Sequence, residues 1–120
     1  MNVFRDTLQR IAQRVEGTRA VSIVGLDGIP IDFYLPAQAV SVEDVAAELG
    51  AFVKRLESPR TQIDFGRIGE MAIVAERSVA ILSRITPEYY LLLLLPSDGN
   101  VGRGRWELKK AAQTLQGELL

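Results

Sequence analysis

The sequence predicts an α+β domain whose elements follow in the order helix, two strands, helix, three strands, helix. Residues 89–95 form an unbroken apolar run. The run is far too short to cross a bilayer, so we interpret it as a central strand covered on both faces. Asp27 and Gly28 separate two apolar strand candidates and form a strong hairpin signal. Apolar residues at helical spacing, with polar residues between them, indicate the three helices.

The first part of the chain is expected to hold one helix and one hairpin. The helix is predicted from Phe4, the first residue of its apolar pattern, to an end near Gly17, and the strands of the hairpin over residues 20–26 and 29–34. Pro30 has no N–H to donate to a neighbouring strand, so the second strand should lie at a sheet edge. Residues 36–40 are predicted to be a loop.

Helix two is predicted to begin after Ser41, which stands three residues before Asp44 in a cap-like pairing. The Ser58-Pro59 pair should end this helix. A polar connection over residues 59–69 follows it. The expected apolar face of the helix consists of Val42, Val45, Leu49, Phe52, Val53 and Leu56.

The second part of the chain is expected to hold three strands and the last helix. The strands are predicted over residues 71–75, 78–85 and 89–95. Asn100 can cap the helix that follows, which we expect to run roughly from residue 101 to residue 119.

Composition excludes several classes of function. The 120 residues suit one domain, residues 1–120, and the net charge of −1 gives no electrostatic reason to expect nucleic acid. There is no cysteine and no histidine, so a thiol nucleophile, the commonest general base and the commonest metal ligand are missing. The N-terminus has no signal-peptide core. We therefore expect a cytoplasmic protein without catalytic residues, cofactor, metal ion or membrane insertion.

Three glycines and two arginines surround the start of the last helix. They are Gly99, Gly102, Gly104, Arg103 and Arg105. A helix N-terminus of this kind can bind phosphate, and either arginine could act on a partner's nucleotide. The spacing is not that of a phosphate-binding loop with its Gly-Lys-Ser/Thr, so a strand-to-helix turn that needs small residues is favoured.

Helix two also carries an unusual group of small residues. Ala46 and Gly50 form one row at i, i+4 spacing, and Ala47 and Ala51 form a second. A glycine in mid-helix costs about 1 kcal/mol relative to alanine, so Gly50 should have a packing reason. Either a partner approaches the helix closely, or the helix lies flat on its own sheet; the sequence favours neither alternative.

The third strand is similarly open to two interpretations. Residues 71–75 are apolar on both faces and follow a long connection. The strand could lie inside the sheet, or it could be an edge that pairs with another chain. An uncovered apolar edge is an aggregation hazard that pairing in a dimer would remove.

Several short segments, taken together, resemble the roadblock/dynein light-chain family, which includes bacterial MglB-like proteins. The resemblance extends over nearly the full chain. The segments are residues 24–28 (VGLDG), 69–70 (GE), 89–91 (YYL), 100–102 (NVG) and 106–112 (WELKKAA).

The resemblance implies a three-layer α/β/α sandwich of the roadblock, profilin-like type. Its five-stranded antiparallel sheet would carry helix two on one face and helices one and three on the other. The strand at residues 29–34 would form one edge, in agreement with Pro30, and residues 71–76 the other. Members of the family dimerise through strand three and helix two, and the paired helices bind a small Ras-like GTPase.

The resemblance thus implies a non-catalytic homodimer that binds a Ras-like (MglA-like) GTPase and modulates its GTP hydrolysis or localisation. The expected dimer interface is Met71, Ala72, Ile73, Val74, Ala75 and Glu76, and the candidate partner-binding residues are Ala46, Ala47, Gly50 and Ala51. The alternative is a structural adaptor in a signalling or motor complex with no nucleotide-linked role. A small-molecule sensor is a third hypothesis, but it needs a polar pocket, whereas the bulky apolar strands predict a filled core.

Overall fold

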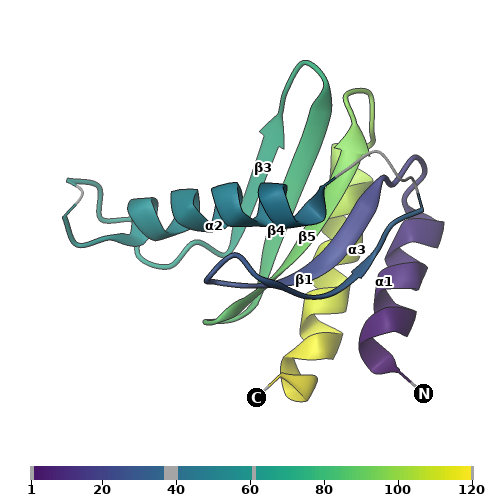
Figure 1. Cartoon of the computed structure of the whole chain (residues 1–120), viewed down its shortest axis with the longest axis horizontal. Helices are drawn as coiled ribbons and strands as arrows, with labels where there is room; N and C mark the ends of the chain where they lie inside the picture. The colour runs from purple at the N-terminus through teal and green to yellow at the C-terminus, as the bar shows by residue number, and fades with distance from the viewer. Residues whose placement is uncertain (1, 37–40, 61, 120) are drawn as a thin grey trace.

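A computed structural model describes residues 2–36, 41–60 and 62–119 of the chain, and it has the predicted order of elements (Figure 1). Most of the predicted loop at residues 36–40, and residue 61 of the connection, lie outside the described residues. The elements are α1 (Val3–Arg14), β1 (Ala20–Gly25), β2 (Pro30–Tyr34), α2 (Val42–Glu57), β3 (Glu70–Val74), β4 (Ser78–Thr86), β5 (Tyr89–Pro96), α3 (Val101–Leu115) and a 3₁₀ turn (Gln116–Glu118).

The five strands form one antiparallel sheet in the order β2-β1-β5-β4-β3. β5 lies in the middle, which explains why its residues are apolar on both faces. β2 lies at one edge, where Pro30 needs no outward partner, and β3 lies at the other. Both edge positions agree with the predictions.

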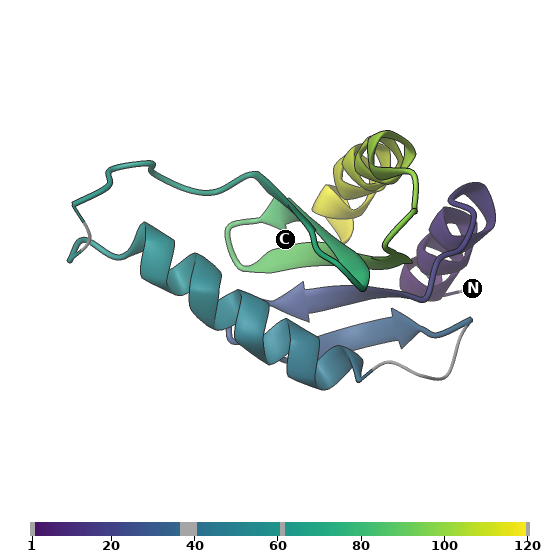
Figure 2. The same ribbon diagram turned by 90° about the horizontal axis from the view of Figure 1, so that it is seen from above.

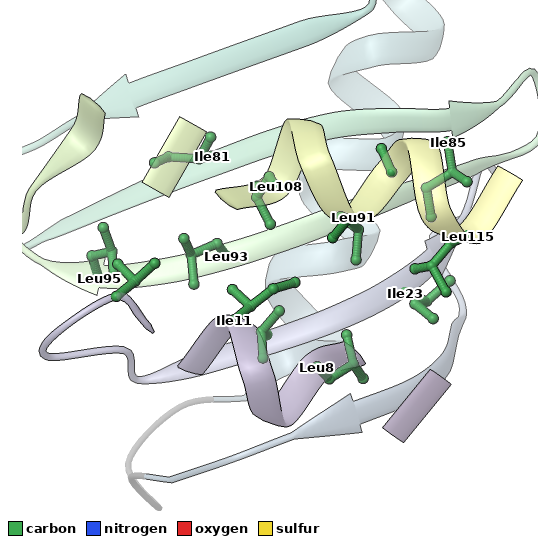
Figure 3. Close-up of a cluster of buried hydrophobic side chains, with 14 of the residues drawn as sticks. Leu8, Ile11, Ile23, Ile81, Ile85, Leu91, Leu93, Leu95, Leu108 and Leu115 are labelled. Carbon is green, nitrogen blue, oxygen red and sulfur yellow. The ribbon is translucent and has the colours of Figure 1, made fainter. Parts of the chain in front are cut away.

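One face of the sheet is covered by α1 and α3 (Figure 2). Figure 3 shows the cluster of buried side chains between these helices and the strands. The helices contribute, among others, Leu8, Ile11, Leu108 and Leu115, and the strands contribute Ile23, Ile81, Ile85, Leu91, Leu93 and Leu95.

The other face of the sheet is covered by α2 alone (Figure 2). Val42, Ala46 and Val53 of the helix pack with Leu82, Leu92 and other strand residues in a second cluster. The side chains of β5 alternate between the two clusters, so the apolar run supplies both cores. The three-layer arrangement with helix two opposite helices one and three is therefore confirmed.

The predicted helix caps are formed. The Ser41 hydroxyl oxygen accepts a hydrogen bond from the Asp44 N–H at 3.3 Å, and Asn100 Oδ1 accepts one from the Arg103 N–H at 2.9 Å. Each bond satisfies an N–H that has no partner within its own helix.

Most element boundaries differ from the predictions by a residue or two, and two boundaries and one burial differ in ways that matter for the surface of the protein. α3 ends at Leu115 and tightens into a 3₁₀ turn, so the helix does not continue to residue 119. β3 ends at Val74; Ala75 and Glu76 lie in the turn to β4, where the Ala75 N–H donates to the Ser78 carbonyl at 2.9 Å. Phe52 is expected on the apolar face of α2, but it is 41% exposed.

No helix in the described part of the chain is long and apolar enough to cross a membrane.

Candidate partner-binding surface

The two rows of small residues on α2 lie in different environments. Ala46 and Gly50 are buried, whereas Ala47 and Ala51 are exposed. The inner row therefore faces the protein's own sheet and hairpin. The outer row is exposed, although the backbone of Ala47 also lies beside Gly28 of the hairpin. The structure thus separates the two rows, which the sequence could not do.

The inner row is small because α2 crosses the β1–β2 hairpin at very close range. A Cβ added to Gly50 would lie 3.3 Å from the Cα of Gly28. A Cβ added to Gly28 would lie 2.9 Å from the Cα of Ala47, and Gly28 has a φ of +86°. Both glycines are therefore needed for the packing of this helix on its own hairpin, which supports the second of the two interpretations for Gly50.

The outer row lies among charged side chains. Ala47 and Ala51 are accompanied on the exposed surface of α2 by Glu48, Lys54 and Arg55. Small side chains allow another backbone to approach the helix closely, and a charged rim around an apolar centre is typical of a reversible protein interface.

The outer edge of β3 carries no strand among the described residues, because β3 pairs only with β4. Met71 and Ile73 are half-buried, and Met71 packs against the core under α2. Ala72 and Val74 point to the other face, where Val74 is 65% exposed. The edge thus presents unpaired backbone groups flanked by apolar side chains.

Two further aromatic residues lie near this edge and were not predicted as site residues. The C-terminal end of α2 and the connection after it project past β3 (Figures 1 and 2). Phe52 on α2 is 41% exposed, Phe65 on the connection is 67% exposed, and Ile63 is exposed as well. The apolar residues 63 and 65, within a segment otherwise rich in polar residues and glycine, were a signal in the sequence that could have found them.

Arg84 of β4 attaches the projecting part to the sheet. Its guanidinium donates to the Glu57 carboxylate at 2.7 Å, to the Ile68 carbonyl at 2.8 Å and to the Pro87 carbonyl at 3.1 Å. Glu57 Oε2 also accepts from the Ile68 N–H at 2.6 Å. Arg84 therefore joins the end of α2, the end of the connection and the β4–β5 turn.

The electrostatics of this cluster follow from its contacts. The hydrogen bond from Arg84 holds the pKa of the Glu57 carboxyl below its ordinary value, although burial acts in the opposite direction. The Arg84 guanidinium lies 4.8 Å from the centre of the Tyr90 ring, a cation–π distance. Burial raises the pKa of Tyr90 to about 12, so its hydroxyl stays neutral.

Two of the three glycines at the start of α3, Gly99 and Gly104, are explained by packing, whereas a Cβ on Gly102 would make only an ordinary contact, 3.6 Å from Asn100 Oδ1. A Cβ on Gly104 would lie 2.8 Å from Ile81 Cδ1, and one on Gly99 would lie 2.7 Å from Leu95 Cβ. Arg103 donates to the Arg14 carbonyl at 3.3 Å, and Arg105 pairs with the Glu70 carboxylate at 2.8 Å. The interpretation as a strand-to-helix turn is therefore supported. Within the described residues, no three acidic side chains are grouped as metal ligands would be.

No protein-family model and no curated protein matches this chain. Solved structures do match it over nearly its whole length. MglC from Myxococcus xanthus is 25% identical, with a TM-score of 0.75 over 98% of this chain and 100% of that chain. A Roadblock/LC7 domain from Streptomyces avermitilis is 14% identical, with a TM-score of 0.80 over 94% of both chains. MglB from Myxococcus xanthus is 14% identical, with a TM-score of 0.83 over 97% of this chain and 86% of that chain.

The chain therefore has the Roadblock/LC7 fold, in agreement with the resemblance found in its sequence. Its structural neighbours within this class include MglB and MglC, at low sequence identity.

Proposed function

We propose that the chain forms a homodimer through β3 and α2, binds a small Ras-like GTPase of the MglA type, and modulates its GTP hydrolysis or localisation. The observation that carries the proposal is the unpaired apolar edge of β3 beside the projecting end of α2. The likeness to MglB supports a GTPase as the partner, since the family resemblance implies that role for MglB-like proteins.

The dimer would form by antiparallel pairing of two β3 strands. Soluble proteins protect long apolar strand edges, and neither a proline nor a lysine protects residues 70–74. Pairing would satisfy the outer backbone groups of the strand and bring the two α2 helices together. Phe52 and Phe65, which are exposed in the single chain, would then be covered by the mate. Such an interface should reach about 1,200–2,000 Å².

The GTPase would bind on the outer row of the paired α2 helices. The side chains of Ala47 and Ala51 are exposed there, although the Ala47 backbone borders the hairpin at Gly28, whereas Ala46 and Gly50 are buried in contacts with the core and the hairpin. Of the four candidate residues, we therefore assign the docking role to Ala47 and Ala51. Arg84 and Glu57 would act as positioning residues, because they hold the end of the helix in place.

This protein would act on the GTPase through its binding surface alone and would supply no catalytic group. The chain has no histidine and no cysteine. Its arginines near the start of α3 are held in intramolecular contacts on the face of the sheet opposite α2. An effect on hydrolysis would then arise because the regulator stabilises one conformation of the GTPase.

The test is GTP turnover by an MglA-like GTPase with and without this protein. We expect the wild type to change the turnover rate, and Ala51→Arg to abolish the change through steric exclusion. Gln13→Arg places the same side chain at an exposed site on α1, on the opposite face, and should behave as the wild type. Binding without any change in turnover would support the adaptor role instead, and an absence of binding would contradict the proposal.

A further inference from the structure

A surface trough lies between α3 and the strands β3 and β4, on the face of the sheet opposite α2. Its volume is about 620 Å³, within the range of ligand-binding cavities. The residues that line it are Gly69, Glu70, Ser83, Arg84, Ile85, Gly102, Arg105, Trp106, Lys109, Ala112, Gln113 and Gln116. We name this trough the α3–β3 groove. The groove is a partly polar pocket on the surface, of the kind that the filled core does not contain.

The groove has a buried floor and an exposed rim. Ser83, Ile85 and Ala112 on the floor are buried, whereas Trp106 and Lys109 on the rim are exposed. The lining residues on α3 extend from position 102 to position 116, about 21 Å along a helix axis. That length matches roughly six residues of an extended peptide and exceeds most small ligands.

Ser83 places a hydroxyl group on the floor of the groove. It is only 7% exposed, and its hydroxyl makes no hydrogen bond with any described residue. The buried side-chain atoms without a hydrogen-bond partner among the described residues are Arg84 Nε, Tyr90 Oη and Glu107 Oε2, so the Ser83 hydroxyl still reaches solvent through the groove and is accessible to an occupant. Ser83 lies in β4 between Ile81 and Ile85, both of which face α3, so its hydroxyl lies on the groove side of the sheet.

The charge of the groove favours an acidic occupant. Arg105 forms a two-bonded pair with the Glu70 carboxylate, at 3.0 and 2.8 Å, so these two charges compensate each other. Lys109 lines the groove and forms no salt bridge within the described residues, but its charge also acts on the Glu70 carboxylate, so two cations share one carboxylate and the three groups carry a net charge of +1. Trp106, 56% exposed, adds an aromatic surface beside these cations.

We propose that the α3–β3 groove binds an extended acidic segment of a partner protein. An apolar side chain of that segment would lie against Trp106, a carboxylate would face Lys109, and a main-chain group would hydrogen-bond the Ser83 hydroxyl. The groove lies on the opposite face from the α2 docking row, so this second partner could be bound together with a GTPase. The proposal does not depend on the proposed function.

The test begins with a random twelve-residue peptide library displayed on phage and selected against the full chain. We expect the enriched peptides to carry an excess of aspartate and glutamate around an apolar residue. Trp106 is the only tryptophan, so its fluorescence reports directly whether a synthetic enriched peptide occupies the groove.

Charge reversal then assigns the contact. Lys109→Glu should weaken binding of the enriched peptide by at least about tenfold, because an attractive charged contact becomes repulsive. Ser83→Ala should weaken it by several-fold, whereas Lys54→Glu, an exposed charge reversal on α2, should leave it unchanged. Peptides without an acidic bias, unchanged binding to Lys109→Glu, or equal binding of free aspartate, which would indicate a small-molecule site, would each overturn the proposal.

Discussion

Arg84 Nη1 lies 2.7 Å from Glu57 Oε2, and this contact joins the sheet to the last residue of α2. The pair is separated by 27 positions in the sequence and is mostly buried. Ile68 bonds to both partners, through its N–H to Glu57 and its carbonyl to Arg84. The orientation of the candidate docking helix therefore depends on one ion pair that lies outside the docking row.

Replacement of Glu57 should destabilise the fold. Glu57→Gln keeps the size of the side chain but removes the charge that faces the buried guanidinium, so we expect a loss of about 1.5–3 kcal/mol in the free energy of unfolding. Urea denaturation monitored by circular dichroism measures this loss in the free energy of unfolding. Glu48→Gln, an exposed change on the same helix, should stay within about 0.5 kcal/mol of the wild type. Equal stabilities for the two variants would contradict this role of the pair.

The same pair should make stability depend on pH in the acid range. The hydrogen bond from Arg84 lowers the pKa of Glu57 in the folded state, so the unfolded state binds more protons as the pH falls. The contribution is fully present above the unfolded pKa, ordinarily 4.5, and is lost as the pH falls through the lower folded pKa. Unfolding free energies measured from neutral pH downward should therefore converge for wild type and Glu57→Gln. A constant difference between the two proteins would show that ionisation of Glu57 is not the cause.

Gly28 should tolerate no side chain. Gly28→Ala combines an unfavourable positive φ with a Cβ only 2.9 Å from the Cα of Ala47, so we expect a loss of about 2–4 kcal/mol. Gly66 offers a matched control, because its φ is +72° but a Cβ would meet nothing within 4 Å. Gly66→Ala should cost only the backbone strain, about 1–2 kcal/mol. If thermal or urea unfolding shows the same loss of stability for both variants, the close contact between the hairpin and α2 does not account for the cost of a side chain at Gly28.

The proposed dimer should be sensitive to changes on β3. Ile73→Pro removes an N–H from the strand and should yield monomer or aggregate. Val74→Arg is the milder probe, because it places a charged side chain on the exposed apolar flank of the proposed seam, where burial by a mate would desolvate the charge, while leaving the backbone intact. Sedimentation velocity should show a dimer for the wild type and for Val3→Arg, an exposed position on α1, but a monomer for Val74→Arg. A dimer of Val74→Arg with unchanged affinity would place the interface elsewhere.

The parts of the fold that follow from local chemistry were predictable from the sequence. Pro30 indicated an edge strand, the apolar residues 89–95 indicated the centre of the sheet, and Asn100 indicated a helix start. Ala46 and Ala47 carry the same side chain, so the sequence does not show which of the two is buried. Only the rotation of α2 about its axis, relative to the hairpin, decides this.

The parts that depend on distant contacts were not predictable. The hydrogen bonds of Arg84 join three segments that are far apart in the sequence. The spacing of apolar residues along the sequence carries no information about such long-range contacts. Phe52 fits the apolar period of α2 and is nevertheless 41% exposed, which the period alone could not reveal. The α3–β3 groove likewise arises only from the spacing between α3 and β3 in the folded chain.

Four arginine variants of α2 test directly whether this helix is the docking surface for an MglA-like GTPase. Isothermal titration calorimetry measures the affinity of the GTPase for each variant, and a thermal melt of each variant reports its stability. Ala47→Arg and Ala51→Arg should fold as the wild type and lose binding at least about a hundredfold, because arginine blocks close approach at the centre of an interface. Ala46→Arg and Gly50→Arg should fail to fold stably, since each buries an unpaired charge. If folded Ala47→Arg and Ala51→Arg both bind the GTPase with unchanged affinity, α2 is not the docking surface and the account is wrong.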